Sequence, residues 1–285
     1  MREKLQTMLK QPGAVPAPAV YDCLSAMTAE KAGFPFLFTS GYGLSASLLG
    51  KPDMGFLTAS EMIDGAKRIA SSVDIPVIAD MDTGYGNPLN VMRTVESLMQ
   101  TPVAGMLLED QVWPKRCGHF EGKNVISAEE HAQKIKAAVD TRGDSGLVLV
   151  ARTDARAIEG LESTLERGKR YLDAGADVLF VEAPQSRDEL ETIARAFEGT
   201  PLMANIIEGG KTPSLTLKEL DEMGFKLVAF ALSGLYAATQ AMMSCYSQIM
   251  EQGSTQGMNT DFAFEDFKEI VKMQDYLNLD DKYSV

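Results

Sequence analysis

Eight short apolar segments recur along the chain, and each ends in polar residues or glycine. They span residues 16–22, 35–43, 75–84, 103–111, 146–154, 176–184, 201–210 and 226–234. Each segment is rich in β-branched or aromatic residues and is apolar at consecutive positions, which is typical of a strand buried on both faces. The pattern therefore predicts eight parallel strands.

Amphipathic helical patterns fill the intervals between these segments. Residues 58–73 open with the capping-box pair Thr58 and Glu61 and then place apolar residues at helical spacing. Strands that alternate with helices predict an α/β fold, and eight such units predict a (β/α)8 TIM barrel. A doubly wound sheet is the alternative, but it would usually show a glycine-rich turn after the first strand, which AVYDCLSAM does not provide.

Beyond about residue 240 the pattern is helical and contains no further strands. We therefore interpret residues 1–285 as a single (β/α)8 barrel domain in which residues 240–285 form extra C-terminal helices. Two alternatives stay open for these helices: they cap the barrel, or they pack on another subunit.

Charge and composition narrow the class of protein. The chain has a net charge of −13, which disfavours binding to the phosphate backbone of nucleic acids. No apolar run reaches the roughly 18 residues that a membrane span requires, and the first residues lack the apolar centre of a signal peptide. The sequence predicts a cytoplasmic protein without membrane or nucleic-acid partners.

Acidic residues follow several neighbouring strands of the predicted barrel. Asp80 and Asp82 are two positions apart, so an extended strand would direct both to the same face, and Glu109 ends the next strand. These ends meet at the face of the barrel that carries active sites. A group of carboxylates without histidine suits Mg²⁺, with Mn²⁺ as an alternative.

Two further features of these strand ends suit an anionic substrate. Arg152 follows the fifth strand, where it can neutralise the acids, clamp a substrate carboxylate, or do both. The small residues Ser40 and Gly41, followed by Tyr42, form a turn whose backbone N–H groups an anion can approach.

The segment WPKRCGHFEGK (residues 113–123) places Cys117 among basic residues. A zinc site is excluded by the count of ligands, because the chain offers no second Cys and His pair nearby. Lys115, Arg116 and His119 are expected to ease ionisation of the thiol. A thiol of tuned pKa can exchange a proton with a carbanion, so Cys117 is a candidate general acid.

Other reaction types fit this set of residues less well. No lysine ends a strand, which disfavours an aldolase that forms a Schiff base, and two histidines are too few for a three-histidine zinc site. A 2-oxo or 2-hydroxy acid held by Mg²⁺ remains, because the metal can polarise its oxygen and stabilise an enolate.

The chain contains, in sequence order, the motifs GKPDMG (50–55), ADMDTGYG (79–86), LEDQ (108–111), KRCGH (115–119), ARTDA (151–155) and EAP (182–184). Together they resemble the isocitrate lyase/phosphoenolpyruvate mutase superfamily, and most closely its members that resemble 2-methylisocitrate lyase and 2,3-dimethylmalate lyase. The resemblance implies a (β/α)8 barrel, Mg²⁺, and a homotetramer (a dimer of dimers) with a helix swapped between neighbouring subunits.

The resemblance also implies a role for individual residues. Asp82 would bind Mg²⁺ directly, with Asp80 and Glu109 acting largely through water. The implied substrate-binding residues are Ser40, Gly41, Tyr42, Asp53, Asp80, Gly118, His119, Arg152 and Asn205. The implied catalytic residues are Cys117, Tyr42, His119, Arg152 and Glu182, with Cys117 as the general acid and the general base left open between Tyr42 and a residue that acts through metal-bound water.

The implied function is that of an Mg²⁺-dependent carbon–carbon lyase. Its substrate would be a small dicarboxylic or tricarboxylic acid of the 2-alkylmalate type, 2,3-dimethylmalate or 2-methylisocitrate, which yields pyruvate and a second carboxylic acid. An oxaloacetate hydrolase that forms oxalate and acetate is one alternative, although Ala231 stands where those hydrolases have serine. A non-catalytic carboxylate-binding barrel is another.

Overall fold

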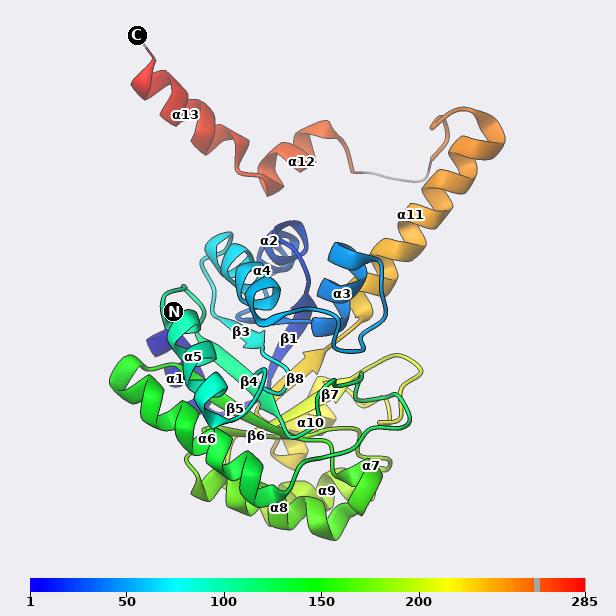
Figure 1. The fold of residues 1–285 in the computed structure, drawn as a ribbon. Helices are drawn as coiled ribbons and strands as arrows, with labels where there is room; N and C mark the ends of the chain where they lie inside the picture. The colour runs from blue at the N-terminus through cyan, green and yellow to red at the C-terminus, as the bar shows by residue number, and fades with distance from the viewer. Residues whose placement is uncertain (259–261, 285) are drawn as a thin grey trace.

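The computed structural model describes residues 1–258 and 262–284 and contains a closed barrel of eight parallel strands (Figure 1). This confirms the predicted (β/α)8 TIM barrel. The strands pair in sequence order, and the barrel closes where β1 pairs with β8. They are β1 (Val15–Val20), β2 (Leu37–Thr39), β3 (Val77–Asp80), β4 (Gly105–Glu109), β5 (Val148–Thr153), β6 (Val178–Val181), β7 (Leu202–Ile206) and β8 (Leu227–Phe230).

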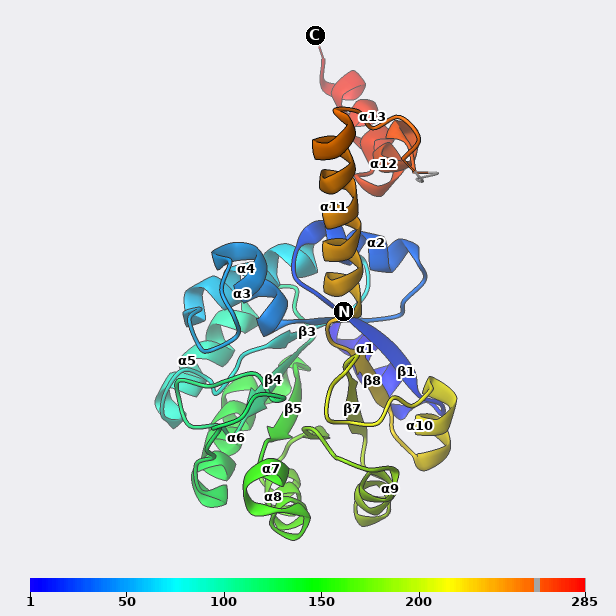
Figure 2. The same cartoon turned by 90° about the vertical axis from the view of Figure 1, so that its right-hand side faces the viewer.

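Helices surround the barrel and separate its strands (Figure 2). Helix α1 (Arg2–Lys10) precedes the first strand, and the others follow in chain order. They are α2 (Cys23–Lys31), α3 (Gly41–Leu49), α4 (Ala59–Ser71), α5 (Pro88–Met99), α6 (Ala128–Arg142), α7 (Arg156–Glu159), α8 (Leu161–Asp173), α9 (Arg187–Ala196), α10 (Leu217–Met223), α11 (Ser233–Gln252), α12 (Phe264–Ile270) and α13 (Met273–Tyr283).

Local sequence signals explain where several helices begin. Thr58 and Glu61 form the predicted reciprocal capping box of α4. Ser186 caps α9 by accepting from the Glu189 N–H, but Glu189 does not return a bond to complete a capping box. The carboxylate of Glu189 instead accepts hydrogen bonds from Arg156 Nε and from the Gln185 N–H, each at 2.8 Å.

The core has two parts, one inside the barrel and one between the strands and the helices. Alternate strand residues such as Ile78, Leu107 and Val150 fill the interior and are fully buried. Leu5 of α1 belongs to the same interior cluster, so α1 covers the amino-terminal end of the barrel. The carboxyl ends of the strands stay available for a site.

The first C-terminal helix leaves the barrel, whereas α12 contacts α2 at its side. Helix α11 projects away from the strands, and none of its residues is buried (Figures 1 and 2). Beyond it, Glu269 of α12 pairs with Lys31 of α2 at 2.5 Å. None of the helices in the described part of the chain is long and apolar enough to cross a membrane.

Candidate active site

One cavity at the carboxyl ends of the strands brings together most of the predicted site residues. Those that line it are Ser40, Gly41, Tyr42, Asp53, Asp80, Cys117, Gly118, Arg152, Glu182 and Asn205. Apolar side chains complete the wall: Phe38, Phe180, Ile207, Ala229, Ala231 and Leu232. The cavity volume is about 50 Å³, far below the roughly 300 Å³ of a small-ligand pocket, so substrate access requires a movement.

The segment 113–123 covers one side of this cavity, whose wall includes Cys117 and Gly118. It is tied down at its centre, where the Cys117 N–H donates to the carbonyl oxygen of Asp53 at 3.0 Å. A Cβ atom at Gly118 would lie 2.3 Å from Glu182 Oε1 and 2.5 Å from an Arg152 nitrogen. Only glycine therefore lets this segment lie so close to the barrel.

The turn formed by Ser40, Gly41 and Tyr42 lies at the amino terminus of α3. The Ser40 hydroxyl caps the helix by accepting from the Gly43 N–H at 3.0 Å. The Gly41 N–H donates to Asp80 Oδ2 at 3.3 Å. In this structure, therefore, the backbone donor that we expected to face an anion is bonded to a carboxylate of the protein.

Asp80 and Asp82 both lie at this end of the barrel, but not for the reason we predicted. Strand β3 ends at Asp80, and Asp82 lies beyond it with a φ of +47°. The prediction of two side chains on one face of an extended strand is therefore wrong. The chain turns, and the Asp82 N–H donates to Asp80 Oδ1 at 3.1 Å. Both carboxylates still approach Gly41, since a Cβ there would lie 2.9 Å from Asp80 Oδ2 and 3.6 Å from Asp82 Oδ1.

Lys115 enters this acidic cluster, which the sequence did not lead us to predict. Its ammonium nitrogen lies 2.7 Å from Asp53 Oδ1 and 2.7 Å from Asp82 Oδ1. The contact to Asp82 lacks hydrogen-bond geometry, so that oxygen has no hydrogen-bond partner. Lys115 therefore neutralises part of the cluster, while the Asp82 oxygen that it faces accepts no hydrogen bond.

The remaining surplus of negative charge fits a divalent cation. The buried Glu109 Oε1, like Asp82 Oδ1, has no hydrogen-bond partner within residues 1–258 and 262–284. Burial raises the pKa of Asp82 to about 6 although Lys115 lowers it, and burial raises the pKa of Glu109 well above its ordinary value. Oxygen ligands of this kind suit Mg²⁺.

These carboxylates are not arranged to bind one ion directly through three side chains. No three His, Cys, Asp or Glu side chains in the described residues converge as a ready set of metal ligands. The donor set therefore suits a cation that keeps water molecules between itself and some carboxylates, as Mg²⁺ usually does.

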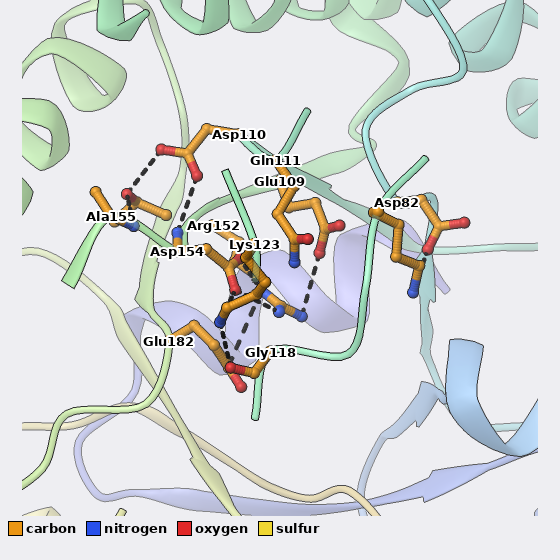
Figure 3. Close-up of polar contacts among 12 residues, drawn as sticks. Asp82, Glu109, Asp110, Gln111, Gly118, Lys123, Arg152, Asp154, Ala155 and Glu182 are labelled. Atoms are coloured by element: carbon orange, nitrogen blue, oxygen red, sulfur yellow. Dashed lines mark hydrogen bonds and ion pairs between the residues drawn. The ribbon is translucent and has the colours of Figure 1, made fainter. Parts of the chain in front are cut away.

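Arg152 is held by acids on several sides (Figure 3). Its Nε lies 2.9 Å from Asp154 Oδ2, and its second terminal nitrogen donates to Asp154 Oδ1 at 3.1 Å. The other terminal nitrogen lies 3.3 Å from Glu109 Oε2. Burial tends to raise the pKa of Asp154, but Arg152 and Lys123 lower it to about 2. Arg152 thus stays charged at the wall of the cavity.

Asp110 supports this arrangement from behind. It accepts a hydrogen bond from the Asp154 N–H at 2.9 Å (Figure 3). It accepts another from the Tyr171 hydroxyl at 2.7 Å. Arg167 adds an ion pair to the same carboxylate at 3.3 Å. A buried network in which each member is paired favours one orientation, so it fixes the backbone that carries Asp154.

His119 joins the covering segment to two other parts of the barrel. Its Nε2 lies 3.2 Å from Glu182 Oε1, and its Nδ1 accepts from the Lys211 N–H at 3.0 Å. A Cβ at Gly210 would lie 2.8 Å from the imidazole ring, so glycine is needed there for the ring to fit. His119 therefore supports the loop in this structure.

The expectation that basic neighbours ease ionisation of Cys117 is wrong. Burial raises the pKa of the thiol to about 11. Lys115 points to Asp53 and Asp82, and Arg116 is exposed and donates to the carbonyl oxygen of Glu121. The thiol is therefore protonated at neutral pH, and this state is the one that a general acid requires.

Several residues of the site were missing from the sequence prediction. Lys115, Lys123 and Asp154 are fully or almost fully buried in the charged network, and Phe180 lies 5.4 Å below the Arg152 guanidinium. The spacing of Arg152 and Asp154 gave a signal, because alternate strand residues share a face. No sequence pattern indicated which loop cations would turn inward.

The chain resembles several known proteins along almost its whole length. It is 47% identical to the chloroplastic carboxyvinyl-carboxyphosphonate phosphorylmutase of Arabidopsis thaliana, over 100% of this chain and 85% of that protein. It is 40% identical to the 2,3-dimethylmalate lyase of Eubacterium barkeri, over 99% and 97%.

A solved structure agrees with these relatives. An oxaloacetate acetylhydrolase in complex with the inhibitor 3,3-difluorooxalacetate superposes with a TM-score of 0.94 at 37% identity, over 99% of this chain and 96% of that chain. Residues 5–250 match the family described as phosphoenolpyruvate phosphomutase. Together with the barrel and its charged cavity, these matches show that the chain belongs to the phosphoenolpyruvate mutase/isocitrate lyase family.

Proposed function

We propose that this protein is an Mg²⁺-dependent lyase that cleaves a 2-alkylmalate to pyruvate and a second carboxylic acid. Relatives named as lyases indicate an enzyme with carbon–carbon lyase activity. The finer proposal concerns the substrate, for which 2,3-dimethylmalate and 2-methylisocitrate are the candidates.

One observation carries the choice of substrate. The cavity combines a charged side, with Arg152 and Asp80, and an apolar side that includes Phe180, Ile207 and Leu232. A carboxylate and its neighbouring oxygen suit the charged side, whereas an alkyl branch suits the apolar side. Cys117 lines the same cavity, and its protonated thiol can supply a proton to carbon.

Each residue of the site would have a distinct role in the cleavage. Arg152 binds the carboxylate next to C2, and a base removes the proton of the C2 hydroxyl group. The C2–C3 bond then breaks, its electron pair stays on C3, and the Cys117 thiol protonates that carbon. Tyr42 and a residue acting through water remain the candidates for the base. Mg²⁺, held by Asp82 and through water by Asp80 and Glu109, would polarise the C2 oxygen.

A panel of acids tests this proposal. The panel contains 2,3-dimethylmalate, 2-methylisocitrate, isocitrate, citramalate and oxaloacetate, each with Mg²⁺ and with chelator. We expect pyruvate from a branched malate and loss of turnover on chelation, with recovery when Mg²⁺ is restored. Equal turnover with chelator would contradict the role of the metal.

Oxaloacetate hydrolysis is the second candidate, favoured by the likeness to an oxaloacetate acetylhydrolase structure. Ala231 lines the cavity and offers only a methyl group there. We expect little oxalate from oxaloacetate for this reason. Carboxyvinyl-carboxyphosphonate, taken from the name of the Arabidopsis relative, completes the panel and should not react.

The exposed apolar face of α11 supports a second proposal, that the chain assembles as a homotetramer. Five large apolar side chains of α11 are at least 44% exposed: Tyr236, Met242, Met243, Tyr246 and Met250. An exposed apolar surface of this kind usually marks an interface with another chain. We expect light scattering to give the mass of four chains, and Met243→Asp together with Tyr246→Asp to lower it. An unchanged mass would contradict this use of α11.

The cytoplasmic location stays a prediction from the sequence.

A further inference from the structure

Lys123 carries a buried charge that the proposed reaction does not use. Its side chain is 2% exposed, and its ammonium nitrogen lies 2.9 Å from Asp154 Oδ1 (Figure 3). The same nitrogen donates to the carbonyl oxygen of Gly118. Burying a lysine is costly unless it is paired and hydrogen-bonded. The bond to Gly118 lies within the covering segment, whereas the pair with Asp154 forms only when this segment lies against the barrel.

Asp154 shares its carboxylate between this lysine and Arg152. Oδ1 accepts from Lys123 at 2.9 Å and from Arg152 at 3.1 Å, while Oδ2 accepts from Arg152 Nε at 2.9 Å. The backbone of Asp154 is fixed by Asp110, so the carboxylate has little freedom to follow the loop. One end of the lysine contact is therefore rigid and the other belongs to the covering segment.

We propose that Lys123 is a positioning residue that fastens the 113–123 segment over the cavity. Through Asp154 it also links closure of this segment to the orientation of Arg152. Closure places Gly118 against Glu182 and Arg152, and it holds Cys117 at the cavity. The effect on turnover rests on the proposed lyase function, whereas the effect on closure does not.

The test compares the wild-type protein with Lys123→Met, which keeps the length of the side chain and removes its charge. Tryptic cleavage after the exposed Arg116 is followed by mass spectrometry without substrate, because a protease needs the segment to leave the barrel. We expect cleavage at least about 10-fold faster in the variant, as loss of a buried pair predicts. In turnover assays, we expect the fold-decrease in kcat of Lys123→Met to exceed its fold-decrease in affinity for pyruvate.

A matched control comes from the same segment. Glu121 also pairs with a lysine, Lys211, at 3.3 Å, but the Glu121 side chain is 93% exposed. Surface pairs contribute about 0–1 kcal/mol, so Glu121→Ala should leave the cleavage rate within about 2-fold of the wild type. Lys123→Arg keeps the charge, so its cleavage rate should lie between those of Lys123→Met and the wild type.

The outcomes separate this proposal from the proposed function. Equal cleavage rates for Lys123→Met and the wild type would overturn it. If circular dichroism shows that Lys123→Met is unfolded, the same comparison is made with Lys123→Gln, and equal cleavage rates for Lys123→Gln and the wild type would overturn it too. The two results can also differ. If trypsin cuts Lys123→Met faster than the wild type, but the wild-type enzyme turns over none of the acids in the panel, the fastening role is supported and the lyase function is contradicted.

Discussion

Replacing Cys117 by serine is expected to lower kcat by about 10²–10⁴-fold, the usual contribution of a general acid. The thiol lines the cavity, and burial raises its pKa to about 11, so it holds a proton throughout the neutral range. Serine has a similar shape but is a much weaker acid. Steady-state rates with the best acid of the panel measure the effect, and calorimetry measures binding of pyruvate.

The two measurements separate chemistry from binding. Pyruvate should still bind to Cys117→Ser, because Arg152 and the acidic cluster are unchanged. Cys245, a partly buried cysteine of α11, provides the control, and Cys245→Ser should keep wild-type turnover. Full turnover in Cys117→Ser would contradict the role of the thiol.

Arg152→Lys is expected to lower kcat/KM by about 10³-fold, because losing the hydrogen bonds of a buried charged partner costs about 2–5 kcal/mol. Lysine keeps the charge but cannot reproduce the fork that binds both oxygens of Asp154. Unlike Cys117→Ser, this variant should also bind pyruvate weakly, which calorimetry can establish.

A control for Arg152→Lys lies on α9. Arg187 pairs with Glu191 and Glu219, and its side chain is 48% exposed. Arg187→Lys should change kcat/KM by less than about 2-fold, because exposed pairs are weak. Wild-type affinity for pyruvate in Arg152→Lys would show that another residue binds the carboxylate.

The pattern of apolar segments was sufficient to predict the barrel, because buried parallel strands and amphipathic helices have different periods. The position of most site residues followed, since strand ends of a barrel meet at one face. Asp80, Glu109 and Arg152 illustrate this, as each occupies or ends a strand.

What could not be predicted lies in turns and loops. The left-handed conformation of Asp82 breaks the alternation on which our reading of the strand depended. The inward direction of Lys115 and Lys123, against the outward direction of Arg116, depends on the path of the loop and on acids more than 30 residues away in the chain. The pKa of Cys117 was misjudged for the same reason, because sequence neighbours are not neighbours in space.

The most direct test of the central claim is the product ratio from 2,3-dimethylmalate, followed by NMR in D₂O with Mg²⁺ present. Cleavage of the C2–C3 bond with protonation by Cys117 predicts pyruvate and propionate in equal amounts, with one solvent deuterium at C2 of propionate. The chelated enzyme and Cys117→Ser should form little of either. An enzyme that leaves this substrate and every other branched malate intact, but converts oxaloacetate to oxalate and acetate, would contradict the account.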